Sequence, residues 1–486
     1  MGVSLYTSRV ILNVLGIENY GIYTIIGGVV GLFGFFNAAM SSATQRFLAI
    51  DIGRKDWDNL QKTFNSTLIV HIGIAALVLL VAETVGLWFV NNKLNIPISK
   101  IGAVNFVYQF SILSSIIAIT QVPFNALIIA HEKMNVFALI SVIEVTLKLL
   151  IVYLLLVSPF NKLETYSALI LFVTFIVSII YKVYCNKNFK ESKFVYYNDK
   201  EMYKVLISYS GWSLFGNIAA IAKEQGINIL LNIFFGTLLN AAFGIMLQVQ
   251  NAVNSFVINF QTAINPQLFK YYANNELDKM FKLMFQSSKL TFYLMLLLIF
   301  PVIYNVDFIL NLWLKTPPEY ASSFVILNLV FLAIDNISNS LMKAVQATGK
   351  IKWYQIILGT FIFLNLPISY LFMKLGFGPE FFLYTSIAIS FLSLLFRLFY
   401  IRLLMPFPSL KFMKSVLVPI VCVIFSSYLI LSFIHLKAES FQGLIVNSLI
   451  TFIIVFVIIL IIGLNKNERD SIKKIIYEKN IKKNCR

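Results

Sequence analysis

Two related stretches of the chain, LNVLGIENYGI (12–22) and LNIFFGTLLNAAFGI (231–245), decide how the fold is organised. Both run from Leu-Asn through a glycine and an asparagine to a Gly-Ile pair. Other matches fall at the same spacing of about 220 residues: QRF at 45–47 with QLF at 267–269, and AHEK at 130–133 with ATGK at 347–350. Because the matches keep their order along the chain, the sequence predicts two equivalent halves.

The composition indicates what these halves are made of. Hydrophobic residues make up 59% of the 486 residues and charged residues 13%, and the mean hydropathy is +0.81, whereas about a quarter of the residues of a soluble domain are charged. Apolar segments recur at close to the ~20 residues that cross a bilayer as a helix. We predict an all-α integral membrane protein of about fourteen helices, over 1–17, 20–44, 66–90, 101–130, 135–157, 165–185, 203–235, 237–264, 283–304, 320–347, 351–373, 380–403, 412–434 and 442–464.

The repeat places six helices in each half and leaves two helices over. An even number of helices per repeat gives both halves the same orientation, so a pseudo-two-fold axis along the membrane normal relates them, and transporters with parallel repeats place the substrate path between the halves. The predicted divisions are an N-terminal half 1–190, a C-terminal half 191–405, two appended helices 406–465 and a basic tail 466–486.

Lysine and arginine are distributed unevenly between the two sides of this zig-zag. Of the 39 such residues, 30 fall in one set of loops and in the tail, six fall in the other set, and three lie inside apolar segments. Since loops rich in Lys and Arg stay cytoplasmic, both termini are predicted inside. This bias and anionic lipid headgroups account for the net charge of +17 without a nucleic-acid partner.

Several kinds of chemistry find no support in the sequence. The three cysteines are scattered and the three histidines isolated, so we expect no disulfide framework, metal site or cofactor. A GxxxxGK[ST] phosphate loop is absent, and the loops are too short to hold a soluble catalytic domain, so we expect no enzyme. The first apolar segment is short for a membrane span, which suggests that the natural first helix begins upstream of Met1.

Charged residues inside apolar segments are the first functional candidates, because each costs ~2.5–3.5 kcal/mol on insertion scales. Glu144 and Lys148 lie one turn apart, in the order that favours an ion pair on one helix. They are either a self-neutralised pair or part of a substrate site. Lys223 and Glu224 are adjacent and point in different directions, so separate partners are expected for them, and Asp335 is a further candidate charge partner.

Arg9 has no acidic neighbour within one helical turn. It therefore needs an anionic partner, which could be Asp335, Glu224 or a substrate. A guanidinium suits phosphate because its planar donors bind two oxygens at once. Substrate contact and structural pairing remain equal alternatives for Arg9, and Arg46 is a further candidate from its charge.

Amide side chains form a second group of candidates. Gln250, Asn254 and Gln261 recur at intervals of four and seven, on one face of the predicted helix 237–264. Amides in hydrocarbon need partners. The stripe could line a wet path for sugar hydroxyls, or it could supply interhelical hydrogen bonds.

Three motifs carry a family resemblance: SLYTSRVILNVLGIENYGIY (4–23), SSATQRF (41–47) and PFNALIIAHEKM (123–134). With the paired halves, they resemble the polysaccharide flippases of the multidrug/oligosaccharidyl-lipid/polysaccharide exporter superfamily. The resemblance implies that the chain moves an undecaprenyl-pyrophosphate-linked oligosaccharide from the inner to the outer leaflet of the bacterial cytoplasmic membrane. Its partners would be membrane lipids, glycosyltransferases and a polysaccharide polymerase. It also implies a V-shaped cavity with cations near its centre.

Within that family, Ser8-Arg9 is similar to the Ser-Arg of the lipid II flippases, whose arginine is tied to the pyrophosphate. The Arg-Asp pair that follows there is replaced here by Glu18-Asn19. The resemblance therefore implies a pyrophosphate role for Arg9 alone, while Arg46, Lys148 and Lys223 are candidates from charge.

Two other functions are weighed against the flippase. A cation-coupled multidrug exporter of the same superfamily would favour acidic residues in the cavity, whereas basic residues are in excess among the candidates. An integral-membrane enzyme, such as a polymerase or an acyltransferase, would need a sizeable outer loop or a membrane His-Asp pair, and neither is present.

Overall fold

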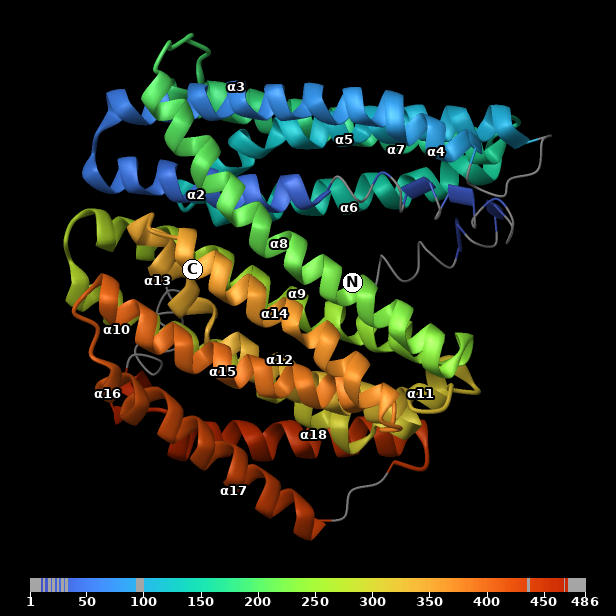
Figure 1. Ribbon diagram of the computed structural model, residues 1–486, viewed down its shortest axis with the longest axis vertical. Coiled ribbons are helices and arrows are strands. Elements are labelled where there is room, and N and C mark those ends of the chain that lie inside the picture. Colours follow the sequence, from blue (N-terminus) through green and yellow to red (C-terminus); the bar gives the residue numbers. More distant parts are fainter. Residues whose placement is uncertain are drawn as a thin grey trace, which may run out of the picture. The chain divides into compact units, whose positions relative to one another are not determined.

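The computed structural model describes residues 34–92, 100–434, 438–466 and 468–470, and scattered positions before residue 34. Every regular element in this part of the chain is a helix (Figure 1). Twelve of the described helices are long and apolar enough to cross a membrane, and they correspond to the predicted helices from 66–90 onward. The predicted all-α membrane fold is thus confirmed. The predicted helix 1–17 and the start of 20–44 fall where only scattered positions are described.

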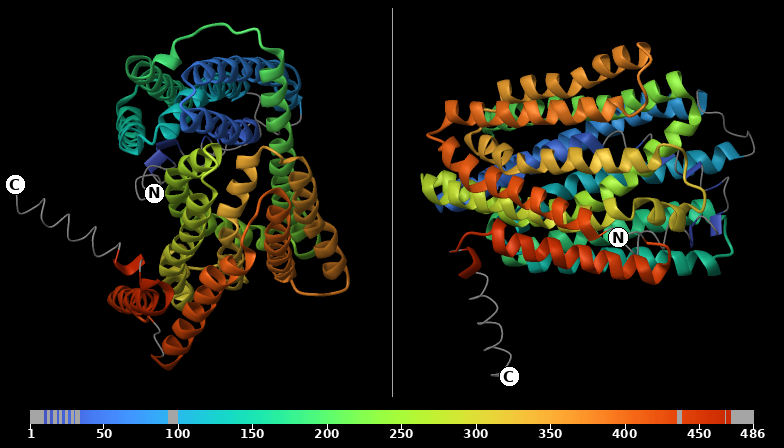
Figure 2. Two further views of the ribbon diagram at one scale, coloured as in Figure 1. Left: turned by 90° about the vertical axis from the view of Figure 1, so that its left-hand side faces the viewer. Right: turned by 90° about the horizontal axis from the view of Figure 1, so that it is seen from below.

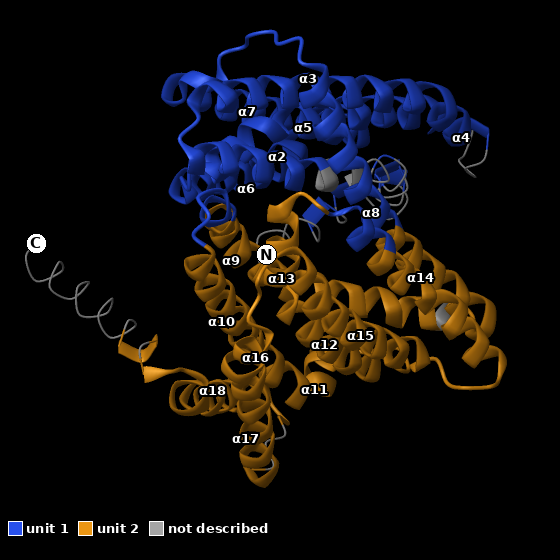
Figure 3. Ribbon diagram, turned by 60° about the vertical axis from the view of Figure 1, so that its left-hand side comes forward, with its two compact units in different colours: residues 1–218, 269–276, 351–356 blue, residues 219–268, 277–350, 357–486 orange. Residues whose placement is uncertain are grey.

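The chain forms two compact units (Figure 3). Unit 1 comprises residues 1–218, 269–276 and 351–356. Within it, α5 contacts α2, α3, α6 and α7, and the later part of α3 continues through the π-helical turn η1 into α4. The elements of unit 1 are α2 (Gly34–Arg54), α3 (Trp57–Val81), η1 (Ala82–Gly86), α4 (Leu87–Asn92), α5 (Ile101–Ala130), α6 (Met134–Val157), α7 (Lys162–Asn188) and η3 (Lys190–Ser192).

Unit 2 comprises residues 219–268, 277–350 and 357–486. A buried apolar cluster joins α8, α9, α10, α12 and α15 at its centre, and α18 packs on α10. Figure 2 shows the helices of the chain from two further directions, coloured along the sequence. The elements that lie wholly or partly in unit 2 are α8 (Lys200–Phe235), α9 (Thr237–Ala273), α10 (Leu277–Tyr304), α11 (Val306–Leu314), α12 (Ala321–Ile337), α13 (Asn339–Thr348), α14 (Lys352–Lys374), α15 (Phe381–Leu404), α16 (Ser409–Phe412), η4 (Met413–Leu417), α17 (Val418–Ile434), α18 (Phe441–Ile458) and η5 (Ile459–Gly463).

Three helices belong to both units: α8 starts in unit 1, α9 ends there, and α14 begins there. The contact-based units therefore interleave along the chain. The predicted halves 1–190 and 191–405 rest on the sequence repeat, and they and the axis relating them stay a prediction.

Several helices extend past the apolar segments that predicted them. α3 begins at Trp57, where the Asp56 side chain caps the helix by accepting a hydrogen bond from the Asn59 N–H at 3.1 Å. α9 continues to Ala273, and α10 begins at Leu277. Hydropathy detects only the part of a helix that lies in hydrocarbon, so polar turns beyond it are missed. The short α11 was not predicted because its nine residues, although apolar, are too few to cross a bilayer. The predicted helix 320–347 is broken at Ser338 into α12 and α13.

Two tyrosines stabilise π-helical turns, one in each unit. The Tyr108 hydroxyl on α5 donates to the Ala82 carbonyl in η1 at 2.8 Å, and Gly86 leaves room for that hydroxyl. The Tyr293 hydroxyl on α10 donates to the Gly463 carbonyl at the end of η5 at 3.1 Å, where a Cβ on that glycine would come within 2.8 Å of the ring. The Ala82 carbonyl accepts the bond from Tyr108 in addition to one from the Leu87 N–H. The Gly463 carbonyl lies at the end of its helix, where carbonyls lack intrahelical donors, and Tyr293 supplies one.

Candidate functional site

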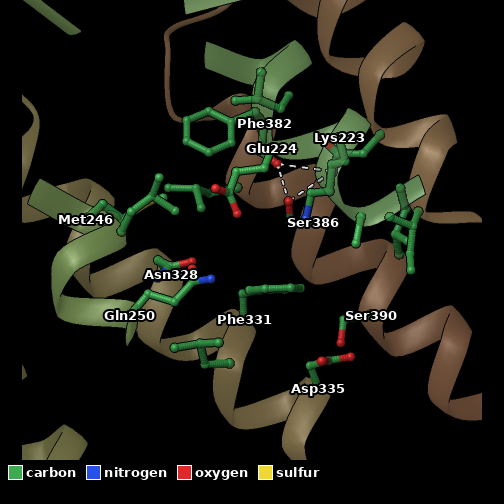
Figure 4. Close-up of a pocket in the computed structure, with 18 of the residues that line it drawn as sticks. Lys223, Glu224, Met246, Gln250, Asn328, Phe331, Asp335, Phe382, Ser386 and Ser390 are labelled. Atoms are coloured by element: carbon green, nitrogen blue, oxygen red, sulfur yellow. Dashed lines mark hydrogen bonds between the residues drawn. The ribbon is translucent and has the colours of Figure 1, made fainter. Parts of the chain in front are cut away.

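Unit 2 encloses a cavity of about 260 Å³ among α8, α9, α12, α14 and α15 (Figure 4). One part of its wall is apolar, with Phe243, Met246, Phe331 and Phe382. The other part is polar and includes four charged side chains from three helices, namely Lys223, Glu224, Asp335 and Arg397. A cavity of this kind suits an amphiphilic ligand, because it offers apolar surface and a few polar groups that can fix orientation.

Two of these charges pair with each other. Arg397 Nη1 on α15 lies 3.5 Å from Asp335 Oδ1 on α12, and the arginine side chain is 9% exposed while the aspartate is 39% exposed. Arg397 was not a predicted site residue, because the positive-inside pattern assigned it to a cytoplasmic loop. A signal did exist in the sequence: Ser386, Ser390, Ser393 and Arg397 recur at intervals of four, three and four on α15, and all line the cavity.

Lys223 is held differently. Its Nζ lies 4.5 Å from the centre of the Phe331 ring, a cation–π contact. Among the described residues, no carboxylate comes within ion-pair distance of this ammonium. Glu224 follows Lys223 on α8 and also lines the cavity, and Figure 4 shows the two side chains diverging. The described lining therefore holds two cations and two carboxylates, so no excess of positive charge is present in it.

Two of the three predicted amide residues on α9 line the cavity. Gln250 and Asn254 line the cavity, and Asn254 Oδ1 also lies 3.4 Å from Asn336 Nδ2 on α12. Asn254 thus makes an interhelical hydrogen bond and faces the cavity. Gln261, farther along α9, is not among the described residues that line it, and its buried Nε2 has no hydrogen-bond partner in the described part of the chain.

A buried polar group supports the wall at α14 and α15. Asn365, fully buried, donates to Ser386 Oγ at 2.9 Å, and Ser386 donates to the Phe382 carbonyl at 2.8 Å. This network fixes the rotamers of two side chains that line the cavity. Sequence reasoning did not select Asn365.

Unit 1 contains a second cavity, of about 410 Å³. Glu144 and Lys148 lie in its wall, joined by a contact of 2.5 Å, and their side chains are 37% and 47% exposed. The predicted ion pair on one helix face is therefore present. The remaining polar side chains of the described lining are neutral, namely Tyr23, Ser111, Ser114, Ser115, Gln121, Ser167 and Thr174.

The two remaining candidate cations lie elsewhere. Arg46 on α2 is 7% exposed, with its guanidinium carbon 4.6 Å from the centre of the Phe47 ring and 5.1 Å from that of Tyr209. These contacts pack Arg46 inside unit 1. Arg9, the candidate implied by the family resemblance, lies outside the described residues.

No protein-family model and no curated protein matches the chain. Solved structures do match it. One is described as the outward-facing conformation of a multidrug resistance MATE family transporter of the MOP superfamily, with 14% identity over 82% of this chain and 91% of that one, and a TM-score of 0.70. A MATE protein in complex with MaD3S matches with 13% identity over 83% and 93%, and a TM-score of 0.73.

A third similar structure is a MOP superfamily transporter from Pyrococcus furiosus, with 14% identity over 85% of this chain and 92% of that one, and a TM-score of 0.68. It is described as having a binding pocket of reverse polarity that suggests a different function. At these identities the matches concern the fold. The chain has the fold of the MATE transporters.

Proposed function

We propose that this chain is a multi-pass membrane transporter that works by alternating access. The MATE-type fold and the twelve candidate spans support transport. The distribution of Lys and Arg supports a cytoplasmic location for both termini. The loops between the described helices offer no separate domain in which an enzyme could work.

For the substrate we propose an undecaprenyl-pyrophosphate-linked oligosaccharide, moved to the outer leaflet during surface polysaccharide synthesis. The observation that carries this proposal is Lys223, a membrane-embedded ammonium that faces a cavity and has no carboxylate at ion-pair distance among the described residues. A pyrophosphate would supply the missing anion. Gln250, Asn254 and Asn328 offer hydrogen bonds to sugar hydroxyls, and the resemblance of residues 4–23 supports the same substrate class.

A multidrug exporter is the second candidate, and the structural matches favour it more directly. One of the similar structures is described as a multidrug resistance MATE family transporter, and another as a MATE protein. Glu224 and Asp335 give the cavity two carboxylates that could bind an organic cation. The Pyrococcus furiosus protein supports the view that pocket polarity separates functions within this fold. The choice therefore depends on which charge the substrate engages.

Reconstitution of the full chain into proteoliposomes tests both candidates. One set of vesicles carries a fluorescent undecaprenyl-pyrophosphate-linked oligosaccharide in the membrane, and translocation is followed by loss of access to an external quencher. A second set measures export of ethidium against a proton or sodium gradient. We expect protein-dependent translocation of the lipid and no coupled movement of ethidium. The opposite result would replace the flippase by the multidrug exporter.

A further inference from the structure

Two short segments from the later part of the chain belong by their contacts to unit 1. They are 269–276, at the end of α9, and 351–356, at the start of α14. Both adjoin loops that the Lys and Arg distribution predicts to be cytoplasmic. The elements that they touch, the end of α2, the turn between α5 and α6, and the first turns of α8, adjoin predicted cytoplasmic loops as well.

The end of α9 is held by an ion pair and by close backbone packing. Lys270 Nζ lies 2.6 Å from Glu132 Oε1, and the side chains are 17% and 41% exposed. On the neighbouring side, a Cβ built on Gly53 of α2 would come within 2.8 Å of the Lys270 Cα. Glycine therefore permits a close approach of α2 to α9 that any other residue would obstruct.

The start of α14 is held by an apolar cluster. Ile351 is 1% exposed and packs with Ala43 of α2 and Tyr209 of α8. Lys352 Nζ lies 5.2 Å from the centre of the Trp212 ring. Gly216 of α8 leaves room for the Gln355 side chain. Segments about 140 to 310 residues apart in sequence thus meet in one apolar layer.

The turn that carries Glu132 is itself fixed. Glu132 adopts a left-handed backbone conformation with φ of 60°, which is uncommon for a residue other than glycine. His131 beside it stacks on Phe189 at 4.2 Å between ring centres, and its Nε2 lies 2.6 Å from Glu191 Oε1. Burial alone would raise the pKa of Glu191, but the hydrogen bond with His131, a backbone hydrogen bond and the charge of His131 together outweigh burial, and the net pKa is lowered. The contacts of His131 therefore hold the turn that carries the Glu132 carboxylate in place.

We propose that these contacts form a gate that seals the predicted cytoplasmic side. The gate comprises Glu132–Lys270, the Gly53 approach and the cluster of Ala43, Tyr209 and Ile351. Loading of a substrate from the cytoplasm requires the segments 269–276 and 351–356 to leave unit 1. The gate contains one partly exposed ion pair and a small apolar layer, so it is weak enough to open reversibly. The role of the gate in transport rests on the proposed function, whereas its existence rests on these contacts.

The test is the accessibility of a cysteine placed in the apolar layer of the gate. Ala43→Cys is introduced into the full chain after Cys185, Cys422 and Cys485 have been replaced by alanine. Inside-out membrane vesicles are treated with a membrane-impermeant maleimide, and the labelling rate is measured. We expect slow labelling in the parent and a rate two- to fivefold higher in Glu132→Gln or Lys270→Ala, in line with the usual energy of a partly exposed ion pair.

Three further variants make this test specific. The charge-swapped double variant Glu132→Lys with Lys270→Glu should return the rate to that of the parent. Gly53→Ala should raise the rate without changing any charge, whereas Gly73→Ala should leave it unchanged, because a Cβ at Gly73 meets nothing within 4 Å. Lys133→Ala is the matched control for loss of one cation from the same turn. Equal labelling of the Lys270→Ala and Lys133→Ala variants, or failure of the swap to restore slow labelling, overturns the gate.

This measurement is independent of the transport assay. Gated labelling in a protein that fails to translocate the lipid probe would remove the proposed substrate and leave the gate in place. Translocation of the lipid probe without any effect of the gate variants on labelling would remove the gate and leave the proposed substrate in place.

Discussion

The two cavities differ in where their charges come from. In unit 1, Glu144 and Lys148 stand one turn apart on α6 and neutralise each other at 2.5 Å. In unit 2, Lys223, Asp335 and Arg397 come from three different helices, and only the last two are paired. Two charges four residues apart on one helix can pair as soon as that helix forms, whatever it packs against. Charges on separate helices meet only when the unit is folded. The unit 2 cavity is therefore the one in which packing has placed an ammonium without a carboxylate partner.

This difference leads to the largest expected effect. Lys223→Glu should lower translocation of the fluorescent lipid-linked oligosaccharide by at least about tenfold, because a charge-assisted contact is lost and repulsion is added. Lys223→Arg should keep most of the activity. Lys148→Glu, the same reversal in unit 1, should change the rate by less than about twofold. Equal loss in both reversals would mean that the unit 1 cavity also binds the anionic group.

The next effect concerns stability. Arg397→Leu leaves Asp335 without its partner in the membrane and should lower the free energy of unfolding by about 1–3 kcal/mol. Thermal unfolding in detergent measures it. Adding Asp335→Asn to Arg397→Leu should recover part of the loss, since the uncompensated charge is then gone. A double variant less stable than Arg397→Leu alone would show that the pair does not act as a unit.

Substitution of an amide side chain in each cavity tests the same difference between the two cavities, with a smaller expected effect. Gln250→Leu removes a hydrogen-bonding group from the unit 2 cavity and should raise the concentration of lipid probe needed for half-maximal translocation by about threefold to tenfold. Gln121→Leu makes the same change in the unit 1 cavity and should leave that concentration unaltered. If Gln121→Leu has the stronger effect, the sugar path runs through unit 1.

The smallest effect is expected at the pair in unit 1. Glu144→Gln or Lys148→Met should lower the free energy of unfolding by less than about 1 kcal/mol, because both side chains are more than a third exposed. Thermal unfolding at low and high salt measures this effect, and the difference from the parent should shrink at high salt. A loss as large as that of Arg397→Leu would place the pair in a far drier environment than its exposure indicates.

Much of the fold was predictable because apolar length is a local property. The predicted helices from 66–90 onward each have a counterpart, and the Glu144–Lys148 pair followed from a spacing of four. The ends of helices were predicted poorly, since Trp57 and Leu277 begin helices in polar sequence that hydropathy does not register. Arg397 was missed because the positive-inside pattern assigned it to a loop, and Asn365 because a single amide in an apolar segment gives no pattern. Each acquires a partner from another helix.

The sequence by itself determined that the chain is a bundle of membrane helices with cationic loops on one side, because hydrophobic length and charge act through the bilayer and need no tertiary contact. Only the tertiary structure decided which charges are neutralised and which segments meet. Lys270 pairs with Glu132, which is 138 positions away in the sequence, and Lys223 contacts an aromatic ring instead of a carboxylate. Such pairings depend on how helices pack side by side, and no local pattern in the sequence encodes that.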